Sequence, residues 1–381
     1  MPTVANYQNP ISPACRPESS YHMTQSVITL SATMLGAGIL TLPRVFALLG
    51  VLYGIIAVYS IALLSAYNLQ WLVQCRLESG KRCYKTLVGN YLGSFSARAL
   101  NVSFIIFLSG TCITNLVVAV DSFPRNMIEL DRSSSLLLLS LVAFPFCLCN
   151  SISSFNGITV LSLVFRSYIP LFLLCERVAS ESSTININWY EGPSSLSDTA
   201  ESLAVLMSSF ICHFIIFQVD LKQTESDSSR AITSIYVSHI GVCATIYVIS
   251  GLSGYLLFGP SVESNVLDSF DSRSDHLKFA KIALSLTNIL KIPLLTVPLR
   301  DALSKEHSST FRWRIVSTAM IITLVTGCAI YISDLFTILE VLGSSVGLVV
   351  AFIFPIALRI SSRNRRESLI LEQQPLIQAM P

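Results

Sequence analysis

Ten apolar stretches follow one another along the chain, each about 18 residues or longer and each with few charged side chains. Stretches of this length are typical of membrane-spanning helices, because about 20 apolar residues cross a bilayer. The first is not a signal peptide, since it is too long and leads directly into the next. The pattern predicts an all-α integral membrane protein with about ten transmembrane helices, covering residues 26–49, 51–75, 99–120, 133–150, 155–176, 202–219, 233–258, 279–299, 315–333 and 335–358.

Two of these spans carry interruptions. In the first, Gly36-Ala37-Gly38 breaks what would otherwise be a continuous helix, and in the sixth small and polar residues interrupt the apolar run at 208–214. Paired interruptions in two halves of a chain indicate a transport site near the middle of the membrane. The alternative for the glycines is that small residues only let two helices pack closely. We expect a five-plus-five inverted repeat with broken first and sixth helices.

The predicted organisation follows from these spans. Residues 1–23 form a disordered cytoplasmic N-terminus, 24–176 the first five-helix repeat, 177–201 an extracytoplasmic loop, 202–358 the second repeat and 359–381 a cytoplasmic tail. With the N-terminus inside, the inner segments hold sixteen Lys and Arg residues and the outer segments four. Positive residues concentrate on the cytoplasmic side of membrane proteins. Both termini are therefore expected to be cytoplasmic.

Composition excludes several classes of protein. Hydrophobic residues make up 52% of the chain, charged residues 13%, and the mean hydropathy is +0.63. The net charge of +2 and the lack of a basic stripe give no indication of nucleic-acid binding. The ten cysteines show no C-x-x-C spacing, and no hydrolase or nucleotide-binding motif is present, so neither an enzyme nor a metal or cofactor site is expected.

Four segments resemble the amino acid/auxin permease family, in particular its sodium-coupled neutral amino acid transporters and its vacuolar amino acid transporters. They are SATMLGAGILTLP at 31–43, SSFICHF at 208–214, GYLLFG at 254–259 with IPLLTVPLRDAL at 292–303, and ISDLFTILEVLGSSVGLVVAFIFP at 332–355. The resemblance implies a leucine-transporter-type fold. That family has eleven spans, and the eleventh is apparently missing here.

The resemblance also implies how a substrate would bind. The α-carboxylate of an amino acid would lie on the backbone N–H groups of Gly36, Ala37 and Gly38, and the α-ammonium group on carbonyls of the unwound parts of spans one and six. A half-helix N-terminus favours an anion, which agrees with this pose. The candidates for lining the side-chain pocket are Thr33, Ser209 and Phe210.

The coupling ion is where the sequence departs from sodium-coupled relatives. Thr29 and Ala32 stand where those relatives have their span-one ion ligands, and Lys291 stands where span eight would supply a hydroxyl. Lys291 is nine residues from Arg300 at the inner boundary, about 13 Å deep, and a charge in the membrane marks a functional site by default. We expect the Lys291 ammonium to replace sodium, so that transport is proton-coupled or sodium-independent. A purely structural Lys291 and a sodium-coupled symporter are the alternatives.

Other charged or titratable residues in the spans are weaker candidates. Arg166 in span five either shares the ion region or makes a helix contact. Arg44 and Glu340 either form a latch at the outer gate or are two separate vestibule residues. His213, at the second interruption, is either a proton carrier or a hydrogen-bonded structural residue.

The C-terminal tail suggests in which cellular membrane the protein resides. Glu372 lies four residues before Leu376-Ile377, which fits an acidic dileucine signal for clathrin adaptors on an extended segment. It indicates an endosomal, lysosomal or vacuolar membrane, with the plasma membrane second. The predicted function is secondary active transport of amino acids, neutral ones first, with cationic ones open and H⁺ or Na⁺ as the candidate coupling ion. An amino acid receptor with little flux is the other class.

Overall fold

The structure is a computed structural model of the chain. It describes residues 23–81, 83–123, 130–148, 156–180, 187–217, 225–270, 274–303, 310–332 and 334–378. The predicted N-terminal tail at 1–23 therefore lies almost wholly outside the described residues.

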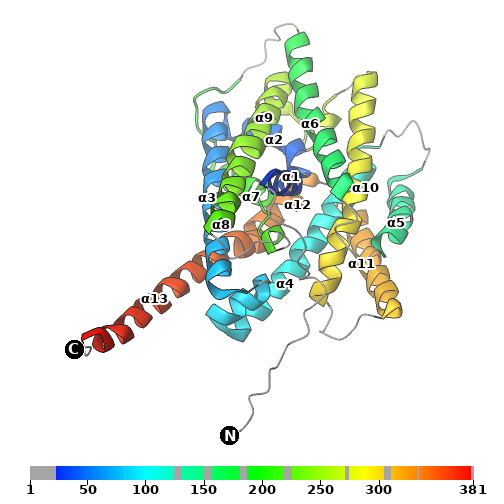
Figure 1. The fold of residues 1–381 in the computed structure, drawn as a ribbon. Helices are drawn as coiled ribbons and strands as arrows, with labels where there is room; N and C mark the ends of the chain where they lie inside the picture. Colours follow the sequence, from blue (N-terminus) through cyan, green and yellow to red (C-terminus); the bar gives the residue numbers. More distant parts are fainter. Residues whose placement is uncertain are drawn as a thin grey trace.

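Every regular element in the described part is helical (Figure 1). The first six α-helices are α1 (Met23–Met34), α2 (Gly38–Leu49), α3 (Val51–Ser79), α4 (Tyr84–Asp121), α5 (Arg132–Cys147) and α6 (Asn156–Ala179). The middle of the chain forms α7 (Leu196–Ser209), η4 (Ile215–Phe217), α8 (Glu225–Tyr236), η5 (Val237–Ala244), α9 (Thr245–Phe258), η6 (Gly259–Ser261) and η7 (Val266–Asp268). The last elements are α10 (Asp275–Leu303), α11 (Phe311–Tyr331), α12 (Leu335–Leu342), η8 (Gly343–Gly347), η9 (Val349–Ile353) and α13 (Phe354–Gln378).

Helices long and apolar enough to cross a membrane number seven in the described chain, or eight when the bent pair α1–α2 is taken as one span. Each of the ten predicted spans contains a helix, but α5 has only 16 residues and α7 stops at the second interruption. An apolar stretch sets no exact helix length, because proline, caps and breaks decide where the helix ends. The total of ten spans stays a prediction.

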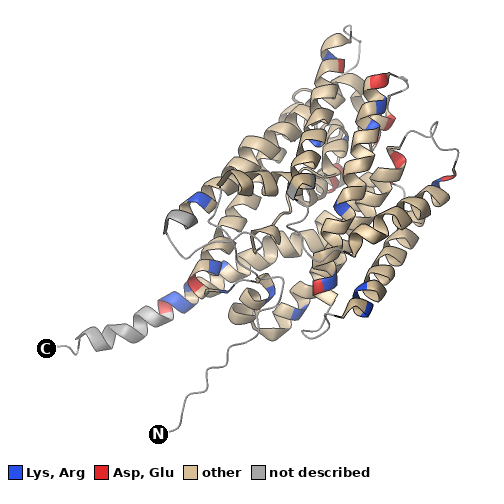
Figure 2. Ribbon diagram, turned by 45° about the vertical axis from the view of Figure 1, so that its right-hand side comes forward, with Lys and Arg blue, Asp and Glu red and all other residues tan. Residues whose placement is uncertain are grey.

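Exposed apolar side chains cover the outside of the bundle. They include Leu63 on α3, Leu141 on α5 and Leu324 on α11, which are 50%, 71% and 62% exposed. Figure 2 shows the charged residues mostly at the two ends of the bundle with a long uncharged zone between them. A surface of this kind is suited to lipid rather than water. The multi-pass membrane prediction agrees with it.

The α1–α2 pair lies in the middle of the bundle, with α3, α6, α7, α9, α10 and α12 around it (Figure 1). Leu35, Ile39 and Phe46 are fully buried there. The first span is thus surrounded by protein, which is the condition under which a break in a helix is tolerated at membrane depth.

The helix ends do not coincide with two of the predicted segment limits. In the segment expected as the outer loop, 177–201, α6 continues to Ala179 and α7 begins at Leu196, where the Ser195 hydroxyl caps its first turn by accepting from the Asp198 N–H at 3.1 Å. In the segment expected as the cytoplasmic tail, 359–381, α13 continues as a helix to Gln378. The assignment of these segments to the two sides of the membrane stays a prediction. The side chains of Glu372, Leu376 and Ile377 lie outside the described residues, so the sorting signal stays a prediction.

Candidate substrate-binding site

The first helix break lies between α1 and α2, whose axes meet at 62°. Residues 35–37 are outside both helices, and Gly36 and Gly38 are poor helix formers. Pro43 on α2 has no N–H to donate to the Ile39 carbonyl, and the Ser250 hydroxyl donates to that oxygen instead at 2.9 Å. The predicted interruption of the first span is therefore present, and a neighbouring helix satisfies its backbone.

The carbonyl groups at the end of α1 receive three side-chain donors. The Lys291 ammonium on α10 donates to the Ala32 carbonyl at 2.8 Å. The Arg166 guanidinium on α6 donates to the Leu35 carbonyl, and the Tyr247 hydroxyl on α9 lies 2.6 Å from the Met34 oxygen. The free carbonyls at a helix C-terminus carry partial negative charge, so cations are stabilised there.

Neither cation has a carboxylate partner among the described residues. Arg166 is fully buried and its second terminal nitrogen donates to Asn288 Oδ1 at 2.8 Å. The Asn288 amide nitrogen donates in turn to the Leu284 carbonyl at 2.8 Å, which fixes the amide with its oxygen toward Arg166. Lys291 is 8% exposed. Two buried positive charges are thus held by carbonyl and amide dipoles alone.

The second break follows Ser209, the last residue of α7. Residues 210–214 are not helical, and the short helix η4 follows them. The Ser65 hydroxyl on α3 donates to the Phe210 carbonyl at 3.0 Å, and the Tyr247 hydroxyl lies 3.1 Å from the Ser209 oxygen. Tyr247 therefore contacts both breaks. The predicted interruption of span six is also present.

Gly38 is the point where the two breaks touch. A Cβ atom at Gly38 would lie 2.2 Å from the Ser209 hydroxyl oxygen and 3.0 Å from its Cβ. A Cβ atom at Gly36 would meet only the Met34 oxygen, at 3.5 Å. The sequence left two interpretations of the glycines, a helix break at a binding site or close helix packing, and they apply to different residues. Gly38 permits close packing, while Gly36 lies in the open break.

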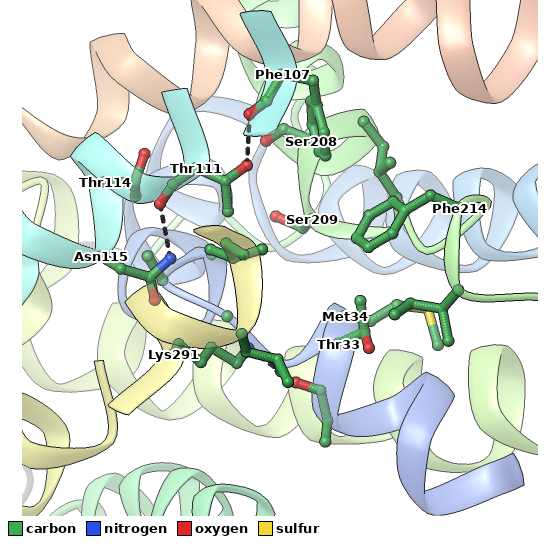
Figure 3. A pocket seen from close by; sticks show the side chains of 18 of the residues that line it. Thr33, Met34, Phe107, Thr111, Thr114, Asn115, Ser208, Ser209, Phe214 and Lys291 are labelled. Carbon is green, nitrogen blue, oxygen red and sulfur yellow. Dashed lines mark hydrogen bonds between the residues drawn. The ribbon is translucent and has the colours of Figure 1, made fainter. Parts of the chain in front are cut away.

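A cavity of about 100 Å³ lies between the two breaks (Figure 3). The backbone at its wall belongs to the ends of α1 and α7 and the start of α2, whose first N–H groups have no carbonyl ahead of them in the helix. Its side chains come from α4, α6, α7, α10 and α12 as well, and no carboxylate is among them. The arrangement offers N–H groups, carbonyl groups and one ammonium to a small ligand.

The chain matches a family model over most of its length. Residues 19–371 match the family described as transmembrane amino acid transporter protein. The chain belongs to this family. It is a member of a transporter family and not an enzyme.

Similar proteins agree with this assignment. Vacuolar amino acid transporter 5 of Schizosaccharomyces pombe is 25% identical over 347 residues, covering 87% of this chain and 82% of the relative. Vacuolar amino acid transporter 2 of Saccharomyces cerevisiae is 20% identical over 369 residues, covering 87% and 75%.

Solved structures share the fold. A Na⁺-coupled sialic acid symporter in a substrate-bound, outward-open state has a TM-score of 0.55 at 13% identity, covering 89% of this chain and 78% of that one. A variant of the Eremococcus coleocola manganese transporter has a TM-score of 0.53 at 15% identity, covering 91% and 81%. The neighbours are transporters of the leucine-transporter-type fold, which is the fold expected from the sequence.

The predicted site residues of this transporter fall into two groups. Thr33, Gly36, Ala37, Gly38 and Ser209 line the cavity together with Lys291. Phe210 does not: its ring is buried behind the break, 5.2 Å from the Tyr247 ring and 6.3 Å from the His239 ring. The prediction that Phe210 lines the pocket was wrong, because the turn after Ser209 directs its side chain toward η5 and α9.

The ion-region and proton candidates are also distributed unevenly. Lys291 reaches the Ala32 carbonyl, one turn beyond the expected Thr29, whose hydroxyl donates to the Gln25 carbonyl of its own helix at 2.8 Å. His213 is fully buried at the second break, and both its ring nitrogens lack a partner among the described residues.

The expected outer latch is not formed in this structure. Arg44 donates to the Pro260 carbonyl at 3.3 Å, and no ion pair joins it to Glu340 in the described chain. Arg44 therefore connects α2 to η6 instead, and the gate role of the pair stays a prediction.

Sequence reasoning missed one wall of the cavity. Thr111, Thr114 and Asn115 on α4 line it together with Phe107. Their spacing of three and four residues places the polar side chains on one helix face, inside an otherwise apolar span. That pattern was the available signal, because polar residues in a span turn toward the bundle interior.

Proposed function

We propose that this chain transports neutral amino acids across an intracellular membrane by alternating access around the cavity between its two breaks, without sodium. The family assignment supports amino acid transport, and the broken helices support a closed midplane site in place of a pore. The two halves, 26–176 and 202–358, would form the inverted repeat whose relative motion opens the site to each side. The vacuolar relatives support a vacuolar or lysosomal membrane.

The substrate pose follows from the dipoles at the break. The α-carboxylate would lie against the backbone N–H groups of Gly36, Ala37 and Gly38, just ahead of and at the first residue of α2, where a helix N-terminus favours an anion. The α-ammonium would lie near the carbonyls that end α7, away from the two cations at the end of α1. No carboxylate lines the cavity, so a cationic side chain would face Lys291 without a compensating charge. This favours a neutral substrate.

The observation that carries sodium independence is the contact of Lys291 with Ala32. Its amino group lies against the carbonyl end of α1, in the place a cation would take, and the Arg166 guanidinium lies about one turn further on. A sodium ion at the same carbonyls would meet strong repulsion from both. The cations would replace the ion structurally. His213, whose two ring nitrogens have no partner in the described part of the chain, is the proposed proton carrier.

Reconstitution of the full chain into proteoliposomes tests this proposal. Uptake of a panel of labelled neutral amino acids is measured with sodium present and with all sodium replaced by choline, at two external pH values. We expect equal uptake in both cation conditions and a dependence on the pH gradient. Complete loss of uptake in choline would contradict sodium independence, and absence of uptake of every amino acid would contradict transport itself.

A further inference from the structure

Five hydroxyl groups of the cavity have a common orientation. Thr33, Ser208, Ser209, Thr111 and Thr114 all line the cavity, and each donates its hydrogen to a carbonyl three or four residues earlier in its own helix, at 2.7 to 2.9 Å. With the hydrogens turned back into the helices, these five oxygens offer mainly lone pairs to a ligand. The Ser162 hydroxyl on α6 also lines the cavity and has no partner in the described chain.

Asn115 adds an acceptor of another kind. Its amide nitrogen donates to the Thr111 carbonyl at 2.7 Å, and this bond fixes the orientation of the amide. Its oxygen, Oδ1, is buried and has no partner in the described chain, while the residue is 4% exposed. In Figure 3 the amide nitrogen points along α4 and the oxygen points away from it, toward the Lys291 side of the cavity. A buried acceptor without a donor is rare in folded proteins.

The packing of α4 against α10 places this oxygen at substrate level. The two helices run antiparallel: the Ser285 hydroxyl donates to the Ala119 carbonyl at 2.6 Å, and the Asn101 amide donates to the Ala302 carbonyl at 2.9 Å. Between these two contacts, Asn115 lies within about one turn of Lys291. The α-amino and α-carboxyl groups are assigned to the two breaks, so the α4 wall is left to the side chain of the substrate.

We propose that Asn115 determines side-chain specificity, by accepting a hydrogen bond from the substrate, so that the transporter favours neutral amino acids with a hydroxyl or amide donor. The inference rests on the proposed function and narrows its substrate class. Aliphatic side chains leave Oδ1 without a donor. Carboxylate side chains give Oδ1 no donor and bring negative charge against it, and cationic ones face Lys291 without an anion.

Side chains of equal shape test this inference. Asparagine, leucine and aspartate differ in donors and charge but hardly in volume, and threonine and valine form a second such pair. Binding to the purified full-length protein is measured as thermal stabilisation over a concentration series, in parallel with competition for uptake. We expect half-saturation at roughly tenfold lower concentration for asparagine than for leucine or aspartate, and for threonine than for valine.

The variant Asn115→Leu removes the acceptor and is expected to bring both ratios to about one. Asn101→Leu is the matched control, because it removes an amide from the same helix at its contact with Ala302 and leaves the ratios unchanged. The wild-type ratios test the inference even where a variant does not fold. A role in packing alone would weaken all ligands equally in Asn115→Leu.

Three results would overturn the inference: wild-type ratios near one, preferred binding of aspartate, or a uniform loss of affinity in Asn115→Leu. If amino acids bind and are taken up with ratios near one, the specificity of Asn115 is contradicted and the proposed function stands. If no amino acid binds or is taken up, both the specificity of Asn115 and the proposed function are contradicted.

Discussion

The two helix breaks differ in what their carbonyl groups meet. At the first break, two of the three donors are cations, Lys291 at Ala32 and Arg166 at Leu35. At the second break the carbonyls of Ser209 and Phe210 meet the neutral hydroxyls of Tyr247 and Ser65. Both breaks leave carbonyl groups that need donors. At the first break two cations meet them directly, whereas near the second break the Arg76 guanidinium donates to the Ile216 carbonyl of η4, two residues after the non-helical segment.

This difference distinguishes two roles of a buried donor: fixing the backbone geometry of a break, and placing a positive charge there. A hydroxyl satisfies an exposed carbonyl at little cost in burial, so neutral donors suffice where geometry is all that is needed. A buried cation without a carboxylate partner is expensive. Its presence at the first break, twice, indicates that positive charge itself is needed there. The first break is thus where we expect fixed cations to take the place of a sodium ion, while the proposed proton carrier, His213, lies at the second break.

The largest effect is expected from Lys291→Met, which keeps the length of the side chain and removes its charge. The variant loses the hydrogen bond to the Ala32 carbonyl. It also no longer buries an ammonium group next to Arg166, which offsets that loss. We therefore expect a free energy of unfolding within about 1 kcal/mol of wild type. Uptake in proteoliposomes should fall at least tenfold. Uptake and thermal denaturation of the same preparation measure the two quantities.

Lys281→Met is the control for this variant. Lys281 lies on the same helix, and its ammonium is 3.3 Å from the Asp268 carboxylate at a site that is partly exposed. Uptake within twofold of wild type is expected there, since exposed ion pairs contribute little. A Lys291→Met protein that transports normally would show that the charge at the first break is structural.

A smaller effect is expected from Gly38→Ala, which pushes the two breaks apart. The new Cβ would overlap Ser209, and overpacking of this kind costs about 1 to 3 kcal/mol. We expect a lower denaturation temperature and reduced uptake. Gly36→Ala has room at 3.5 Å and should keep the denaturation temperature near that of wild type.

The double variant Gly38→Ala/Ser209→Gly tests the cause. Removal of the Ser209 side chain removes the clash, so the denaturation temperature should recover in part. An equal fall in denaturation temperature for Gly36→Ala and Gly38→Ala would contradict the assignment of the close contact to Gly38 alone.

The breaks themselves could be predicted from the sequence. Gly36 and Gly38 in one apolar run, and Ser208 and Ser209 in another, conflict with a helix that must satisfy its own backbone, and that conflict is visible without coordinates. Lys291 was equally visible, because its distance from the inner end of its span fixes its depth and a deep charge needs a partner. Both arguments depend only on position along one helix.

The partners of these residues could not be predicted in the same way. Tyr247 follows the π-helical segment Val237–Ala244. The wider turns of this segment change the direction of the side chains that follow, compared with the directions expected for a regular α-helix of 3.6 residues per turn. Phe210 lies in a turn, where no helical periodicity sets the side-chain direction. Arg44 meets Pro260 because η6 folds back over α2, and only the tertiary structure shows that contact.

The smallest effect is expected from Tyr247→Phe, which removes the one hydroxyl that contacts both breaks. The Met34 and Ser209 carbonyls lose the one O–H donor that they share, and single hydrogen bonds in membrane proteins contribute about 0.6 to 2 kcal/mol. Because the lost donor is neutral, denaturation temperature and uptake should decline together, by a few degrees and a few-fold. Ser65→Ala, which affects the second break alone, is expected to do less. A Tyr247→Phe protein with normal stability and uptake as low as in Lys291→Met would show that the neutral donors are as important to coupling as the charged ones, and would remove the distinction between the two breaks.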